Sequence, residues 1–237
     1  MRGQLKHKAQ RFGLEVFPRD EAPARHLHFN SYASVVLSGS FVEAGFGGRV
    51  NVQPGDVLLH SRFDCHANSS TCSRSVTILN LPWRDGWVEG HFHVADPDLL
   101  VRLAEKDSRE SMSALAAGMQ PAQSASHHWT GLLASDLQTK ACLSLRRWAR
   151  SFGMRPEALS RGFHREFGVS PKQYRLEVRA KRAWREVLRS PRTLTTIAYE
   201  LGFSDLSHLS RSVRLLTGYS PSAWRSWARN SVQAQVP

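Results

Sequence analysis

The sequence predicts a two-domain α+β protein, with a β-rich N-terminal domain and an all-α C-terminal domain. Three observations predict this fold: short apolar runs between glycines up to about residue 95, helical periodicity from residue 96 onward, and an internal repeat near the end of the chain. The 237 residues are 41% hydrophobic and 22% charged, which excludes a disordered, collagen-like or disulfide-scaffold chain. We expect domains at 1–95 and 128–237, joined by a helical linker or dimerisation segment at 96–127.

The formal charge of +12 is unevenly distributed. Residues 138–237 contain 19 basic and 6 acidic residues, whereas residues 1–137 contain 13 basic and 14 acidic residues. Because the basic excess is confined to one half, it predicts a polyanionic partner for that half, either a nucleic acid or an anionic membrane surface.

Cysteine usage and hydropathy predict a cytoplasmic location and no membrane partner. The N-terminus lacks an apolar segment of signal-peptide length, and no run of about 18 apolar residues occurs in the chain. The three cysteines, Cys65, Cys72 and Cys142, form no CxxC pair, and their odd number fits a reducing compartment.

The region from Glu15 to His93 has the pattern of an antiparallel sheet. Its apolar runs, such as Ala33–Leu37 and Val76–Leu81, are short and are separated by glycines and by Pro54-Gly55. Short strands between turn residues are typical of a β-sandwich or β-barrel.

Helical signals begin at Asp96. Asp96 is a suitable N-cap, Pro97 suits the first helical position, and Gly118 is a suitable end for the stretch, as one long helix or two short ones. Its leucine-bearing stripe predicts packing against the barrel and a face for a homodimer. Residues 118–127 have linker composition.

The internal repeat predicts two helix-turn-helix units. Leu145, Ala149 and Gly153 recur 49 residues later, and a longer set that includes Leu159, Arg161, Gly168 and Pro171 recurs 50 residues later. In each copy we expect a short helix, a glycine turn and a second helix. The helices of the first copy are expected at Ser144–Phe152 and Pro156–Phe167, and those of the second copy at Thr195–Leu201 and Asp205–Thr217. The expected buried residues of the second helices are Leu159, Phe163 and Phe167, and then Leu206, Leu209 and Val213.

The stretches ALSRGFHREFGVSPKQYR and IAYELGFSDLSHLSRSVRLLTGYSPSAWR resemble the paired helix-turn-helix domain of the AraC/XylS transcription regulators. The resemblance covers about the last 100 residues and departs from the family at Leu209 and Val213, where phenylalanines are usual. It implies two subdomains joined by one long helix, about Pro171–Arg189, with both recognition helices in the major groove of double-stranded DNA. A helix of about 19 residues spans roughly 28 Å, close to the roughly 34 Å between successive major-groove passages.

Outward positions of the repeat supply candidate DNA contacts. Arg161 and Arg211 are equivalent, and arginine donates two hydrogen bonds to guanine; a phosphate or an internal carboxylate is the alternative partner. Ser170 and Ser220 are expected N-caps, alone or with a bound phosphate. Arg175, Arg179, Arg182 and Arg189 form a basic stripe that is either solvated or close to phosphates. The full set of predicted DNA-binding residues is Glu157, Ser160, Arg161, His164, Arg165, Lys172, Ser207, His208, Ser210, Arg211 and Arg214.

Residues 20–82 resemble the two-part motif of cupin barrels. The motif is His26-Leu-His28 with Gly39, followed by Gly48, Pro54-Gly55-Asp56, His66 and Asn68. In metal-binding cupins the first part supplies two histidines and a carboxylate; here Tyr32 takes the carboxylate position and no other acidic residue is near. We therefore expect a sensor pocket lined by His26, His28, Tyr32 and His66, with no metal, no cofactor and no catalysis. Metal binding by these histidines, helped by His60, is the open alternative.

These observations predict a sequence-specific DNA-binding transcription regulator that is not an enzyme. A small-molecule effector, RNA polymerase and a second copy of the chain are the expected partners besides DNA. The alternative is a cupin-type metal-binding protein or enzyme fused to a DNA-binding module.

Overall fold

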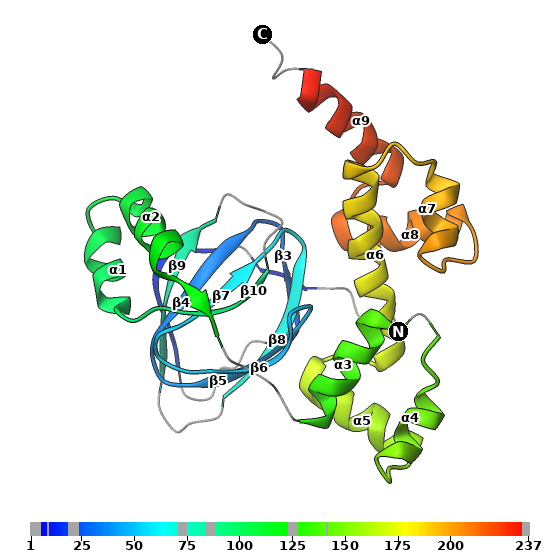
Figure 1. The fold of residues 1–237 in the computed structure, drawn as a ribbon, viewed down its shortest axis with the longest axis horizontal. Coiled ribbons are helices and arrows are strands. Elements are labelled where there is room, and N and C mark those ends of the chain that lie inside the picture. The colour runs from blue at the N-terminus through cyan, green and yellow to red at the C-terminus, as the bar shows by residue number, and fades with distance from the viewer. Residues whose placement is uncertain are drawn as a thin grey trace.

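The computed structural model describes residues 6–8, 10–18, 24–70, 75–83, 89–122, 128–140 and 142–233. It consists of a sheet region and a helical region that lie side by side (Figure 1). Cys72 lies outside the described residues, while Cys65 is a buried free thiol and Cys142 an exposed one. Within the described part of the chain, the helices are all too short or too polar to span a bilayer.

The sheet region contains two sheets. Five strands pair in the order β1-β3-β8-β5-β6, and six pair in the order β11-β10-β7-β4-β9-β2. Neither sheet closes on itself among the described strands, so the closed cupin-like barrel stays a prediction. The strands are β1 Lys6–His7, β2 Gly13–Phe17, β3 His26–His28, β4 Tyr32–Ser38, β5 Phe41–Gly45, β6 Gly48–Val52, β7 Asp56–His60, β8 Asp64–Ser70, β9 Val76–Pro82, β10 Gly90–His93 and β11 Gln120–Pro121.

Side chains of strand β4 point alternately to the two faces of the six-stranded sheet, and each face packs in a different apolar cluster. Ala33 and Val35 point to one face, where they pack with Leu100 of α1 (Pro97–Ala104) and Leu115 of α2 (Ser108–Gly118). Val36 points to the other face and packs with a separate apolar cluster. The two helices therefore cover the outer face of the six-stranded sheet (Figure 1).

The segment after residue 95 is helical as predicted, in two pieces. The Asp96 carboxylate accepts a hydrogen bond from the Leu99 amide at 2.8 Å, which confirms the N-cap, and Asp107 caps the second helix. Part of the predicted 118–127 linker is strand β11, which pairs with β10, and residues 123–127 lie outside the described residues.

The helical region follows the repeat closely. Leu159, Phe163 and Phe167 are fully buried, as predicted. The prediction for Leu206 was wrong: it is the first residue of α8, faces solvent, and leaves Leu216 to complete the buried stripe with Leu209 and Val213. The helices are α3 Trp129–Thr139, α4 Leu145–Ser151, α5 Pro156–Phe167, α6 Pro171–Arg189, α7 Leu194–Glu200, α8 Leu206–Thr217 and α9 Pro221–Gln233.

The two regions share one apolar core. Leu27, Phe46 and Phe63 of the sheet region belong to the same buried cluster as Tyr174 and Trp184 of α6. A buried ion pair crosses the same boundary, because Arg25 lies 2.7 Å from Glu177 and both side chains are 5% exposed. Helix α6 is thus held against the sheet region along its length.

Candidate nucleic-acid interface and ligand pocket

The two helix-turn-helix units have matching backbones. Unit one is α4 with α5, and unit two is α7 with α8. Their tight turns contain Gly153 and Gly202 at φ of 64° and 71°, and their second helices end at Gly168 and Gly218 at φ of 70° and 83°. These left-handed positions favour glycine, which explains why the repeat places glycine at all four.

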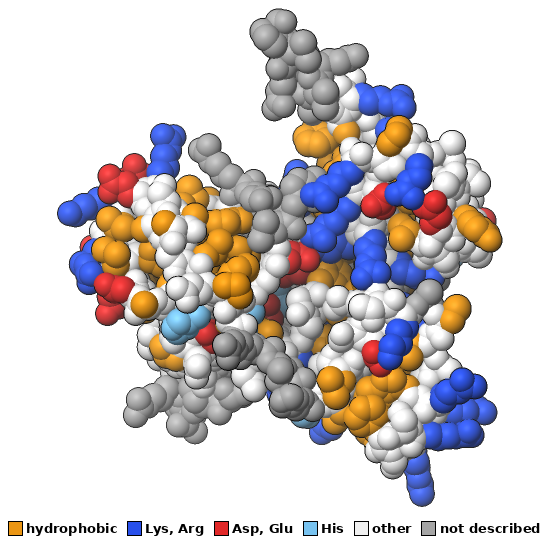
Figure 2. Space-filling view, in the orientation of Figure 1, with side chains coloured by type: hydrophobic (Ala, Val, Ile, Leu, Met, Phe, Trp, Pro, Cys, Tyr) orange, Lys and Arg blue, Asp and Glu red, His pale blue; other side chains and the backbone are white. Residues whose placement is uncertain are grey.

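The predicted DNA-binding side chains lie on the open face of these units. On α5 and the start of α6, Glu157, Arg161, His164, Arg165 and Lys172 are exposed and Ser160 is half-buried. On α8, Ser207, Arg211 and Arg214 are exposed, while His208 and Ser210 are half-buried. Lys and Arg side chains gather over the C-terminal helices in the space-filling view (Figure 2). The arrangement presents a basic surface from both units.

Several polar groups in this region have structural partners. Ser170 accepts from the Gln173 amide and Ser220 from the Ala223 amide, each at 3.2 Å, so both predicted N-caps are confirmed. The His208 ring lies 3.1 Å from the Ser204 hydroxyl, which ties it to the turn of unit two.

The arginines of the predicted basic stripe on α6 differ in their surroundings. Arg175 donates to the Leu143 carbonyl at 2.9 Å, and Arg179 donates to the Gly202 carbonyl, so both guanidinium groups stabilise loop backbone. Arg182 is exposed. The part of the stripe that remains open to a phosphate is therefore smaller than the sequence indicated.

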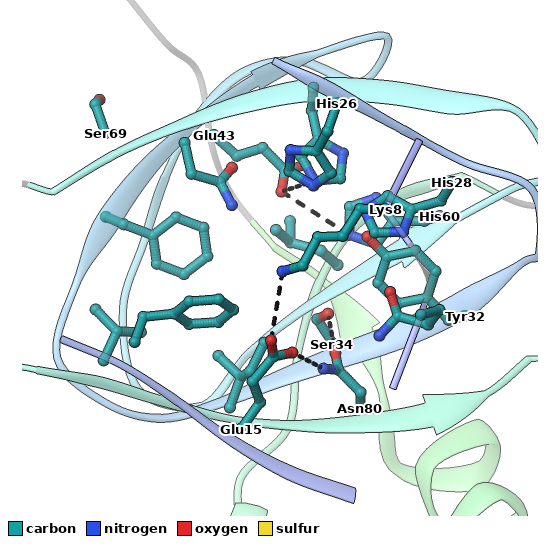
Figure 3. A pocket seen from close by; sticks show the side chains of 18 of the residues that line it. Lys8, Glu15, His26, His28, Tyr32, Ser34, Glu43, His60, Ser69 and Asn80 are labelled. Atoms are coloured by element: carbon teal, nitrogen blue, oxygen red, sulfur yellow. Dashed lines mark hydrogen bonds and ion pairs between the residues drawn. The ribbon is translucent and has the colours of Figure 1, made fainter. Parts of the chain in front are cut away.

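A pocket lies between the two sheets (Figure 3). Its empty volume is about 640 Å³, open solvent at its mouth included. The predicted ligand-binding residues His26, His28, Tyr32 and His66 all line it. Lining residues that the sequence analysis did not single out include Lys8, Glu15, Ser34, Phe41, Glu43, Leu58, Val76, Ile78 and Asn80.

One wall of the pocket carries a chain of polar contacts. Asn80 donates to Glu15 at 2.9 Å, Ser34 donates to Asn80 at 2.6 Å, and Lys8 lies 3.4 Å from Glu15. Phe41 and Ile78 line the pocket as well, which makes it partly apolar. Such a mixed lining suits an organic molecule with a polar group.

The histidines form a compact cluster. Ring centroids of His26 and His28 are 4.7 Å apart, those of His26 and His66 are 4.5 Å apart, and Tyr32 stacks on His60 at 4.3 Å. As alternation on a strand predicts, His26 and His28 face the same side. Neither ring nitrogen of His28 has a hydrogen-bond partner in the part of the chain that the structure describes.

Two carboxylates join this cluster, which corrects the expectation that none would be near. Asp64 accepts from His60 Nδ1 at 2.7 Å and from His66 Nδ1 at 2.9 Å. Glu43 Oε2 lies 3.9 Å from His60 Nε2 and 3.8 Å from His66 Nε2. Glu43 lies on β5, which pairs with β8, and Asp64 lies on β8, which pairs with β3. Strand pairing therefore brings both acids close to the histidines, and no local sequence signal indicated them.

Burial shifts the pKa values of this cluster. Burial, with His66 and His26 nearby, lowers the pKa of His28 to about 2, and burial lowers the pKa of His66 to about 3. Burial raises the pKa of Glu43 to about 7. Burial opposes protonation of His60, but Glu43 and Asp64 outweigh it and raise the pKa of this imidazole. The pKa of Tyr32 is raised mainly by burial, so its phenol keeps its proton.

Comparison with known proteins identifies the C-terminal region. A family model described as a helix-turn-helix domain matches residues 148–226, and a search of curated proteins found no match. A transcriptional regulator with an AraC-type DNA-binding domain from Chromobacterium violaceum is 25% identical, covering 42% of this chain and 88% of its own, with a TM-score of 0.36. The C-terminal domain of the response regulator AraT from Geobacillus stearothermophilus is 22% identical over 44% and 88% of the two chains, with a TM-score of 0.39. ToxT from Vibrio cholerae, solved with an unsaturated fatty acid, is 12% identical over 90% and 93%, with a TM-score of 0.38.

The family match and the paired units identify residues 148–226 as a helix-turn-helix domain, a class of domain that binds DNA. This domain lies C-terminal to a separate, sheet-rich region of the chain.

Proposed function

We propose that the chain reads a specific DNA sequence with α5 and α8 and that a small molecule bound between the sheets changes this activity. The observation that carries the proposal is the display of Arg161 and Arg211, both exposed, at equivalent positions of two units joined by the single helix α6. Arginine in such a position donates two hydrogen bonds to guanine in the major groove.

The effector fits the pocket as an organic molecule with a polar end. Lys8, Glu15 and Asn80 offer both donors and acceptors, while Phe41 and Ile78 offer apolar surface. His28, with both ring nitrogens unpartnered among the described residues, offers a further hydrogen bond to a ligand.

The contacts that link the pocket to the DNA-binding domain run through Asp64. This carboxylate holds His60 and His66 on the pocket side, and Lys181 of α6 lies 3.5 Å from its other oxygen. Lys181 also pairs with Glu89, as does Arg185 of the same helix. A ligand that moves the histidines therefore acts on a charge network that includes α6, the helix shared by both units.

The test is selection of bound sequences from random double-stranded DNA with the full chain. A single enriched sequence is expected, and Arg161→Ala combined with Arg211→Ala should remove the enrichment. Arg109→Ala, which removes the same charge from an exposed position on α2, should leave it unchanged. Enrichment that survives the double substitution, or no enrichment with the unmodified chain, would contradict sequence reading by these helices.

A further inference from the structure

The cluster of Glu43, His60, Asp64 and His66 is arranged as three ligands and a supporting carboxylate. The four residues are buried, and one ligand atom from each lies within 4.8 Å of the others. They come from three strands, β5, β7 and β8, so the sheet itself fixes their relative positions.

Asp64 determines which nitrogen of each imidazole faces inward. Because an ionised carboxylate only accepts hydrogen bonds, the Nδ1 atoms of His60 and His66 donate to it, at 2.7 and 2.9 Å. In the neutral rings the Nε2 atoms then carry lone pairs. A carboxylate behind a histidine is the usual means by which proteins orient an imidazole toward a metal ion.

Both Nε2 atoms face the same oxygen of Glu43. The separations of 3.9 Å and 3.8 Å are too long for hydrogen bonds. They are close to what two bonds of about 2.0–2.2 Å from nitrogen and oxygen to one ion allow. Three Lewis bases therefore converge on one point.

We propose that the chain binds one divalent transition-metal ion of the zinc class between Glu43 and the Nε2 atoms of His60 and His66, with Asp64 orienting the two imidazoles. Imidazole and carboxylate ligands suit Zn²⁺ and its neighbours, and three protein ligands leave a coordination position open. His60, His66 and Glu43 all line the pocket, so the open position is accessible to a ligand there.

A second observation supports a bound group at this place. His28 stacks on His66 with ring centroids 5.2 Å apart, is 2% exposed, and has no partner for either nitrogen among the described residues. A buried imidazole without partners is costly unless a further polar group completes its hydrogen bonds. The ion's remaining ligand would be such a group.

This inference concerns the N-terminal domain alone and is independent of DNA recognition. The test uses the full chain without an affinity tag, stripped of metal with a chelator and titrated with Co²⁺, whose visible absorption reports its coordination. One Co²⁺ per chain should bind saturably and be displaced by one equivalent of Zn²⁺. Wild-type protein that binds no Co²⁺ saturably would overturn the proposal.

Variants then assign the ligands. Glu43→Gln and His66→Gln should each abolish the signal at equimolar Co²⁺, and Asp64→Asn should lower affinity by about 10–100-fold. His93→Gln, which alters a half-exposed histidine on β10 that pairs with Asp56 and is not one of the proposed ligands, should bind as the wild type does. Circular dichroism confirms that each variant folds, and Glu43→Gln keeps the test valid if His66→Gln does not. Wild-type affinity in folded Glu43→Gln, or loss of the signal in His93→Gln, would refute the assignment.

Discussion

The two helix-turn-helix units have the same backbone conformation, but different parts of the molecule pack against them. At the end of unit one, a Cβ placed on Gly168 would lie 2.7 Å from Cβ of Arg25, whereas one placed on the equivalent Gly218 of unit two would meet nothing within 4 Å. Unit one packs on strands β5 and β8 of the sheet region. Unit two leaves large side chains exposed, among them Leu215 at 65% and Tyr199 at 85%.

A second equivalent pair explains part of this difference. Gly162 of unit one admits the Trp129 ring of α3, since a Cβ there would come within 2.7 Å of it. Ser212 stands at the same place in unit two, is buried, and donates to the His208 carbonyl at 2.8 Å. The comparison shows that the glycines at the turns allow the backbone conformation of each unit. The size of a few residues on the helices, such as Gly162 and Ser212, determines which elements pack against that unit.

The largest expected effect comes from breaking the ion pair behind unit one. Arg25→Ala leaves the Glu177 carboxylate buried without its cation and should lower the free energy of unfolding by about 3–5 kcal/mol. Urea unfolding followed by circular dichroism measures it. The control is Glu200→Ala, which breaks an exposed pair with Arg192 and should cost about 0–1 kcal/mol. Equal effects of the two changes would mean that unit one is not held by this pair.

Alanine at the two terminal glycines compares the units directly. Each substitution forces a left-handed alanine, at a cost of about 1–2 kcal/mol. Gly168→Ala must also displace Arg25, which adds about 1–3 kcal/mol of overpacking. Thermal unfolding of both variants gives the difference, and a larger loss for Gly218→Ala would contradict the described packing.

DNA recognition should be more symmetrical. Arg161→Ala and Arg211→Ala should each weaken binding by about 1–3 kcal/mol and relax preference at one base position, whereas Lys172→Ala should weaken all sequences alike. Binding to a library of site variants separates these outcomes. Uniform loss with either arginine variant would reassign that arginine to a phosphate.

The smallest effect concerns the start of the second helix of each unit, α5 and α8. Asp205 accepts from the His208 amide at 2.7 Å, while Arg155 at the start of α5 makes no such bond. Asp205→Ala should therefore reduce thermal stability slightly, and Arg155→Ala should not, because only one of them removes a cap. Identical melting curves for the two variants would show that the cap does not contribute.

Local patterns made the helical region predictable. The spacing of Leu159, Phe163 and Phe167 defines α5, and Ser170-Pro171 marks the start of α6, because these signals lie within a few residues of one another. The error at Leu206 arose because an apolar residue in the first turn of a helix can face solvent without breaking the stripe.

The pocket was only half predictable. The histidines His26, His28 and His66 were found from a local motif, but Glu43 and Asp64 reach them through the pairing of strands far apart in the sequence. Likewise, nothing local to Arg25 indicates that its partner is Glu177, 152 residues further along. Contacts of this kind depend on the tertiary fold and produce no periodic pattern in the sequence from which they could be predicted.

The position of Arg25 and its apolar neighbours also has a consequence for biosynthesis. Tyr174 and Trp184 of α6 pack in the same buried cluster as Leu27, Phe46 and Phe63 of the sheet region. The three residues of the sheet region can therefore be buried only after the ribosome has translated α6. From Phe63 to the end of α6 at Arg189 the ribosome adds 126 residues, which at about 5–20 residues per second takes roughly 6–25 s. During this interval the nascent N-terminal domain exposes an apolar face, which makes it a substrate for chaperones and the stage at which aggregation competes with folding.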